Sequence, residues 1–107
     1  ADITEPALRK FEKHLLHELG YALQLSYEAH TDIPISADQY YLFVPQEGFS
    51  QVQTKSNESV FRGEVLLKIA DDDFAEAQVL RDAKRLMRLS LQPLLGNKRI
   101  KSRELFI

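Results

Sequence analysis

Residues 71–95, DDDFAEAQVLRDAKRLMRLSLQPLL, decide the fold class, because they predict one long helix at the centre of the domain. Apolar residues recur every three or four positions from Ala77 to Leu94, which is the spacing of a helical face. We place the helix at about Phe74 to Leu95. Asp72 or Asp73 is its expected N-cap, since a carboxylate stabilises the positive end of the helix dipole.

This predicted helix carries apolar residues on two of its sides, a pattern typical of a buried helix. The main face consists of Ala77, Leu80, Ala83, Met87, Leu91 and Leu94. A second face consists of Val79, Leu86 and Leu89. A chain of 107 residues buries only a modest share of its surface, so we expect something outside it to cover the second face.

Basic residues gather in the last quarter of the chain, at Arg81, Lys84, Arg85, Arg88, Lys98, Arg99, Lys101 and Arg103. Only two acidic residues oppose these eight between residues 80 and 107, which gives +6 there, although the whole chain carries −2. Spacings of three from Arg81 to Lys84, four from Arg81 to Arg85 and three from Arg85 to Arg88 place the first four on one side of the helix, where they could neutralise phosphates. The alternative is a solvated face that favours the negative end of the helix dipole. An anion-binding surface is predicted, with nucleic acid as the leading candidate.

Outward from this helix, a first helix is predicted from about Glu5 to Leu19, with Thr4 as its N-cap. Its apolar face consists of Leu8, Phe11, Leu15 and Leu19. Gly20 is the expected left-handed C-cap, and Tyr21 can then pack back on Leu16 as in a Schellman motif.

The middle of the chain combines a loop with a predicted hairpin. Pro34 and several polar residues make 23–38 irregular, whereas 40–44 and 49–53 are rich in β-forming residues. Gly48 is expected at the turn position that needs a positive φ. The hairpin aromatics are Tyr40, Tyr41, Phe43 and Phe49. Such rings can stack on bases, but alternation favours burial in the core.

A polar loop is expected at 55–59 and a short helix at 64–69, beginning near Gly63. Gly96 is the expected C-cap of the long helix, and Ser102 could cap a final turn over 103–107. Together these elements predict one α+β domain over residues 1–107, predominantly helical, with one β-hairpin packed on a small helical bundle.

No residue set in the chain predicts catalysis or a metal site. Cysteine is absent, which excludes thiol catalysis and zinc sites built on thiolates. His14 and His17 are expected to be exposed surface residues rather than ligands, and 71–73 lack the spacing of a calcium loop. No Ser–His–Asp set or phosphate-binding Gly loop is present. No stretch approaches the ~20 apolar residues of a membrane span. Because no catalytic or metal-binding set is present, we expect a non-enzymatic binding protein without a cofactor.

Two segments resemble the bacterial RecO family of recombination mediators. The first reads LRKFE at 8–12, LL at 15–16 and LGY at 19–21. The second reads AKR at 83–85, then Arg88, Leu91, Pro93, LG at 95–96, Lys98 and KSRELF at 101–106. Their order and spacing agree with the family and frame almost the whole chain.

The resemblance implies that the chain is a C-terminal helical domain whose N-terminal oligonucleotide-binding fold is missing. That preceding domain would cover Val79, Leu86 and Leu89. The family mediates DNA repair and recombination in the bacterial cytoplasm, at the nucleoid, and binds single- and double-stranded DNA, RecR and the acidic tail of single-stranded-DNA-binding protein. Some members hold zinc through cysteines after the first helix. Residues 27–30 occupy that stretch here without a cysteine, so no zinc is expected.

DNA contact is assigned to the eight basic residues between Arg81 and Arg103. A peptide tail that ends in an apolar residue and a carboxylate needs an apolar pocket beside a cation. The candidates are Arg9 as the cation, with Leu16, Leu19 and Tyr21 as the pocket, although these residues could simply pack helices together. The alternative function is a protein-interaction module that recognises an acidic tail without touching DNA.

Overall fold

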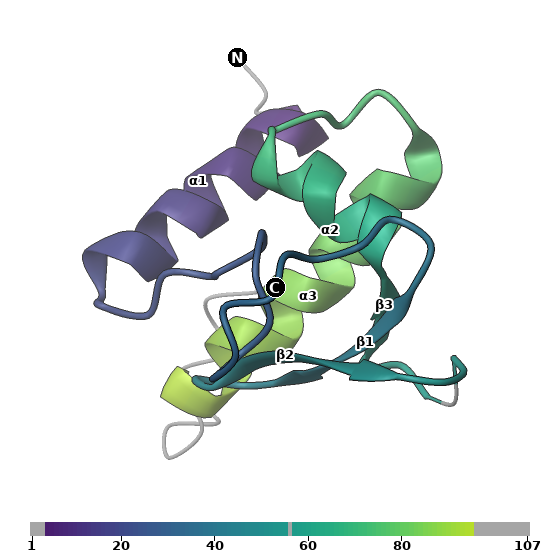
Figure 1. Ribbon diagram of the computed structural model, residues 1–107. Helices are drawn as coiled ribbons and strands as arrows, with labels where there is room; N and C mark the ends of the chain where they lie inside the picture. Colours follow the sequence, from purple (N-terminus) through teal and green to yellow (C-terminus); the bar gives the residue numbers. More distant parts are fainter. Residues whose placement is uncertain (1–3, 56, 96–107) are drawn as a thin grey trace.

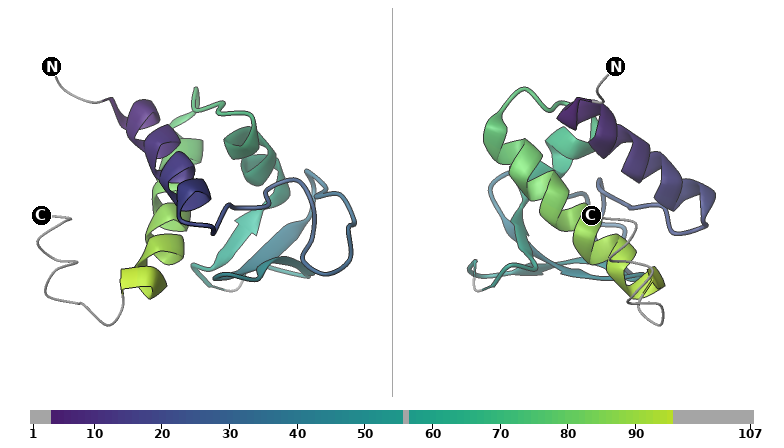
Figure 2. Two further views of the ribbon diagram at one scale, coloured as in Figure 1. Left: turned by 90° about the vertical axis from the view of Figure 1, so that its left-hand side faces the viewer. Right: turned by 180° about the vertical axis from the view of Figure 1, so that it is seen from behind.

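The computed structural model describes residues 4–55 and 57–95. Its elements in chain order are α1 (Glu5–Glu18), β1 (Tyr40–Val44), β2 (Gly48–Val52), β3 (Val60–Arg62), α2 (Gly63–Ala70) and α3 (Ala77–Leu95). Figure 2 shows α3 between α1 and the sheet, while α2 lies at the end of the sheet near α3. The predicted α+β class is confirmed. Within the described residues, no helix is both long and apolar enough to span a bilayer.

The sequence signals at both ends of α1 are confirmed. The Thr4 side chain accepts a hydrogen bond from the Ala7 N–H at 3.3 Å. At the other end Gly20 has a φ of 86°, which is favourable for glycine. The Tyr21 N–H donates to the Leu16 carbonyl at 2.8 Å, and the Gly20 N–H donates to His17 at 3.0 Å, which is the backbone pattern of a Schellman motif.

The predicted hairpin is confirmed and is extended by a strand that the sequence did not reveal. β1 and β2 pair in antiparallel register from Tyr40 opposite Val52 to Val44 opposite Gly48, and Gly48 has a φ of 122°. β3 pairs antiparallel with the other edge of β1, so the strand order is β2-β1-β3. β3 has three residues, too few to show an alternating pattern, which is why the sheet was predicted with two strands.

The hairpin aromatics are core residues, as alternation predicted. Tyr41, Phe43 and Phe49 are buried, while Tyr40 is half-buried. The rings of Phe43 and Phe49 lie 5.0 Å apart, and Phe61 of β3 meets Phe49 edge-on. The buried Tyr41 hydroxyl accepts a hydrogen bond from the Ser36 N–H at 2.8 Å, which satisfies its polar end.

The acidic run before α3 does not cap that helix, so this prediction is wrong. α3 begins at Ala77, whereas Asp72 has a φ of 56° and belongs to the C-terminal turn of α2. The Asp73 N–H donates to Lys68 at 2.8 Å, closing that turn. Lys13 of α1 donates to the Asp72 carboxylate at 2.7 Å. The turn redirects the chain so that Phe74 enters the core instead of starting a helix.

The chain itself covers both apolar faces of α3, which corrects the expectation that a preceding domain would do so. Val79 and Leu86 are buried in the main core with the sheet and α2, and Leu89 packs against that core. On its other side, α3 packs Met87 and Leu91 against Leu16 of α1, with Leu15, Leu23 and Leu94 around them. The two apolar faces of α3 therefore match two neighbours within one small domain.

A close approach of two backbones fixes the junction between β3 and α2. A Cβ atom on Gly63 would lie 1.9 Å from the Ser36 carbonyl oxygen, so only glycine fits. The Gly63 N–H also donates to the Gln39 carbonyl at 2.8 Å. The predicted short helix is confirmed and begins at this residue. The predicted caps at Gly96 and Ser102 lie outside the described residues.

Candidate nucleic-acid interface

The outward side of α3 carries three exposed cations. Arg81, Lys84 and Arg88 are all exposed and follow one another at spacings of three and four residues. Packing of α3 between α1 and the sheet determines which side remains outward, because Val79, Ala83, Leu86 and Met87 turn inward. We call Arg81, Lys84 and Arg88 the α3 cation row.

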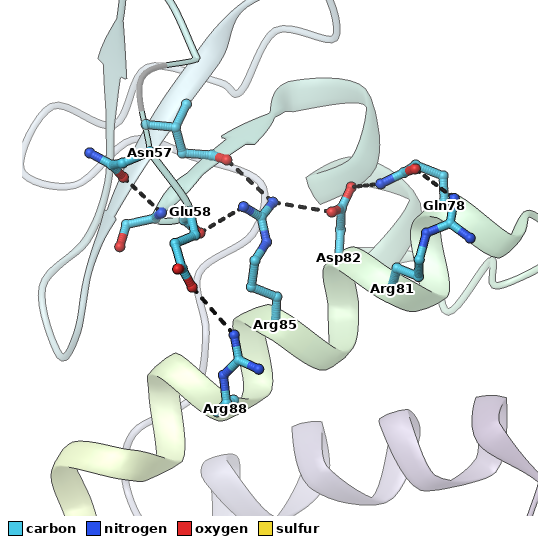
Figure 3. Close-up of polar contacts among 9 residues, drawn as sticks. Asn57, Glu58, Gln78, Arg81, Asp82, Arg85 and Arg88 are labelled. Carbon is cyan, nitrogen blue, oxygen red and sulfur yellow. Dashed lines mark hydrogen bonds and ion pairs between the residues drawn. The ribbon is translucent and has the colours of Figure 1, made fainter.

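Arg85, which the sequence placed in the same stripe, is instead part of the protein's own packing (Figure 3). Its guanidinium donates to the Glu58 carbonyl at 2.7 Å, to the Val60 carbonyl at 3.3 Å and to the Asp82 carboxylate at 3.1 Å. It also lies 4.1 Å from the centre of the Phe61 ring, in cation–π contact. With its side chain only 16% exposed, Arg85 joins α3 to β3 and is not free to bind a phosphate.

The partners of the α3 cation row are weak enough to be displaced. Arg88 lies 3.4 Å from the Glu58 carboxylate, but the two side chains are 58% and 74% exposed. Solvent screens such a pair, and its net contribution is about 0–1 kcal/mol. Arg81 donates to the neutral Gln78 side chain at 2.8 Å, as Figure 3 shows. The positive charges of Arg81 and Arg88 therefore remain largely available to an anion.

Lys84 is exposed, yet it lies close enough to α1 for its positive charge to act on the Glu12 carboxyl. Burial raises the pKa of Glu12 above its ordinary value of 4.5, and the positive charges of Arg9 and Lys84 act in the opposite direction without outweighing burial. The Arg9 Nε lies 3.0 Å from the Glu12 Oε1. Neither atom meets hydrogen-bond geometry with another group in the described part of the chain. The Arg9–Glu12 pair is thus a buried ion pair within α1.

Of the four residues predicted to bind a peptide tail, two are buried and two are exposed. Arg9 and Leu16 are only 4% and 1% exposed, whereas Leu19 and Tyr21 are 51% and 45% exposed. The structure does not bring these four side chains together as one open pocket. Lys98, Arg99, Lys101 and Arg103, the second half of the predicted DNA site, lie outside the described residues.

The stretch after α1 does not fit the cysteine-bound zinc that the family resemblance implies for some members. It lacks cysteine, and residues 4–55 and 57–95 contain no group of three potential metal ligands. His30 lies near Glu47 on the surface, at 3.6 Å. Backbone bonds close the loop, since the Glu28 N–H donates to Ile33 and the Ile35 N–H donates to Ser26, both at 2.8 Å. His14 and His17 are exposed, as expected.

Sequence reasoning missed the contribution of the loop before β3. Glu58 places its carbonyl against Arg85 and its carboxylate against Arg88, so one residue binds two neighbouring arginines (Figure 3). The separation of 27 residues between Glu58 and Arg85 leaves no local pattern to detect. The only sequence signal would have been the third strand, which brings that loop beside α3.

Comparison with known proteins gives close matches over the whole domain, although no family model matches the chain. DNA repair protein RecO of Coxiella burnetii (strain RSA 493 / Nine Mile phase I) is 43% identical over 101 residues, covering 94% of this chain and 44% of that protein. RecO of Mannheimia succiniciproducens is 41% identical over 105 residues, covering 98% and 46%. RecO of Photobacterium profundum is 43% identical over 107 residues, covering 100% and 45%.

The chain spans slightly less than half the length of these curated relatives. The match to the Photobacterium profundum protein includes both segments on which the resemblance was based, because it extends over 100% of the chain. Identity at this level over 101 to 107 residues reflects common descent. The chain is therefore homologous to a section of DNA repair protein RecO that makes up somewhat under half of that protein.

Proposed function

We propose that this chain acts in DNA repair and recombination as a non-enzymatic DNA-binding domain of a RecO-like protein. The observation that carries the proposal is the α3 cation row, in which Arg81, Lys84 and Arg88 are exposed on one side of a well-packed helix. Homology to proteins named for DNA repair supports the biological role. The same proposal places the domain in the bacterial cytoplasm, at the nucleoid.

The geometry suits a phosphate backbone better than a small anion. Arg81 and Arg88 are separated by about 10 Å along the helix axis, which corresponds to roughly three base-pair steps of DNA. Separate cations spread over such a distance neutralise several phosphates and read no base sequence. Lys98, Arg99, Lys101 and Arg103 are assigned to the same interface, because they follow α3 directly in the chain.

The test is charge reversal of the α3 cation row, with Arg81, Lys84 and Arg88 all changed to Glu. Fluorescence anisotropy with a labelled oligonucleotide should show at least about tenfold weaker binding at low salt. The slope of log affinity against log salt should fall by up to about 0.9 for each phosphate that the variant no longer neutralises. Arg85 is left unchanged, because its replacement would disturb folding as well as charge.

A matched control reverses three exposed cations away from α3, namely Lys10, Lys55 and Arg62. It alters net charge by the same amount but leaves the α3 cation row intact. If both triple variants weaken binding equally, the effect is one of overall charge and the assigned interface is wrong. If neither variant changes affinity, DNA binding by α3 is excluded.

An acidic peptide tail is the second candidate ligand, and the exposure of Leu19 and Tyr21 beside the end of α1 favours it. These side chains could hold an apolar residue of the tail, but Arg9 would have to become uncovered to bind its carboxylate. Titration with a labelled acidic peptide distinguishes the candidates. Peptide binding that Leu19→Ala and Tyr21→Ala remove, with oligonucleotide binding absent, would replace the DNA proposal. Binding to RecR stays a prediction from the family resemblance.

A further inference from the structure

One side of α1 presents a row of large apolar side chains to solvent. Leu8, Phe11 and Leu19 are 36%, 59% and 51% exposed, and Leu15 between them is half-buried. At 3.6 residues per turn, the four lie within roughly a quarter of a turn of one another. We call Leu8, Phe11, Leu15 and Leu19 the α1 ridge.

Apart from Leu15, which also packs beside Met87 and Leu91 of α3, the α1 ridge is not the surface by which α1 contacts the rest of the domain. A neighbouring side of α1 makes most of these contacts, and there Arg9 and Leu16 are buried. On the same side Lys13 donates to the carbonyls of Ile69 and Ala70 at 3.0 and 3.3 Å. Isolated exposed apolar residues are ordinary, but a continuous row along a helix marks an interface. Its spacings of three, four and four residues are those of a helix–helix seam.

We propose that the α1 ridge is the docking surface for an amphipathic helix from the part of a RecO-length protein that lies outside this match. The length of the curated relatives indicates where this helix would come from. The chain spans only 44–46% of their length, so more than half of each relative lies outside the match and could contain the docked helix. The occupant must carry apolar residues every three or four positions. This inference is independent of DNA binding, which uses the outward side of α3.

Charges beside the α1 ridge indicate the flanks of the docked helix. Glu5 and Glu18 are exposed and lie three residues from Leu8 and Leu15, so each borders the ridge within one turn. Glu18 has only the exposed His14 as a partner in the described residues, at 3.3 Å. A partner helix with lysine or arginine beside its apolar seam would therefore complement the ridge better than an acidic one.

Single-cysteine labelling tests the proposal, since this chain contains no cysteine of its own. Phe11→Cys reports on the ridge, and Lys10→Cys reports on the adjacent exposed side of the same helix. In the 107-residue chain we expect both thiols to react rapidly with a maleimide. In a RecO-length protein that contains this domain, here called the full-length protein, with other reactive cysteines replaced, Phe11→Cys should react at least about tenfold more slowly, while Lys10→Cys keeps its rate.

Equal labelling of Phe11→Cys in both proteins would overturn the proposal, because nothing would then cover the ridge. Slow labelling in the 107-residue chain, together with a dimer in sedimentation velocity, would assign the ridge to a second copy and would also overturn it. As an independent readout, Phe11→Ser with Leu19→Ser should lower the melting temperature of the full-length protein and leave that of the 107-residue chain nearly unchanged. An unchanged melting temperature in the full-length protein contradicts docking.

Discussion

Helices α1 and α3 have similar apolar periodicity but different surroundings. α3 has neighbours on two sides, with Leu86 buried against the sheet and Met87 buried against α1. In the described part of the chain, α1 buries apolar side chains mainly on the side that faces α3, so Leu16 is 1% exposed while Phe11 is 59% exposed. A helical repeat of apolar residues therefore identifies faces that need cover without telling which of them the same chain covers.

The difference also separates the two kinds of basic residue in α3. Where the helix is covered, as at Arg85, a cation becomes part of the packing and is satisfied by carbonyls, a carboxylate and an aromatic ring. Where it faces outward, as at Arg81 and Arg88, the cations keep weak partners that an incoming phosphate can replace. Position relative to the core, more than residue type, divides structural arginines from candidate ligands.

The largest effect on stability is expected from a substitution on the side of α3 that packs against the sheet. Leu86→Ala should lower the free energy of unfolding by about 3 kcal/mol, because it leaves a cavity in the main core. Urea denaturation followed by circular dichroism measures this decrease. A cost below about 1 kcal/mol would mean that the sheet does not cover this side of α3.

Arg85→Ala should lower the free energy of unfolding by a smaller amount, about 2 kcal/mol. The change leaves two carbonyls and the Asp82 carboxylate without their donor, and it leaves the Phe61 ring without its cation. Arg81→Ala is the control on the outward side and should change stability by less than about 0.5 kcal/mol. Equal costs for the two variants in the same urea titration would erase the distinction between structural and free arginines.

For α1 the expectation is a contrast between its two sides within one helix. Phe11→Ser in the 107-residue chain should shift the unfolding free energy by no more than about 0.5 kcal/mol, whereas Leu16→Ala should cost about 2–3 kcal/mol. Thermal melting of both variants provides the check. Strong destabilisation by Phe11→Ser would show that the ridge is already covered in this chain.

The smallest effect on stability concerns the Arg9–Glu12 pair within α1. Burial raises the folded-state pKa of Glu12 above 4.5, so the folded chain binds this proton more tightly than the unfolded chain does. The stability from that proton is present below pH 4.5 and is lost as pH rises through the folded-state pKa. Glu12→Gln lacks this pH-dependent decrease. Its stability relative to wild type should therefore rise as pH increases from 4.5 through the folded-state pKa of Glu12. Parallel pH profiles from chemical denaturation would contradict the burial of the carboxyl.

Local signals were sufficient for much of the fold. Thr4 and Gly20 predicted both ends of α1, and alternation predicted the hairpin and the burial of its aromatic residues. In each case the physical cause lies within a few residues of the signal. The short helix at Gly63 was predicted in the same way, although the approach of Ser36 that requires glycine there could not be foreseen.

Long-range pairings account for what the sequence did not predict. Asp72 and Asp73 have the chemistry of a helix N-cap, but a left-handed Asp72 and its contact with Lys13 place them at the end of α2. The four basic residues of α3 could be assigned to one side by spacing, whereas the removal of Arg85 from that set depends on Glu58, 27 residues earlier. Contacts of that separation follow from the third strand, which is too short to be recognised.

The direct passage from β3 into α2 has a consequence for the evolution of chain length. β3 ends at Arg62 and α2 begins at Gly63, with the Ser36 carbonyl against the glycine. An inserted residue here would rotate α2 relative to the sheet and push a side chain or backbone into Ser36, so the junction tolerates neither growth nor shortening. Insertions and deletions should instead accumulate in the exposed turn at 53–55, where an added loop would disturb no packed element.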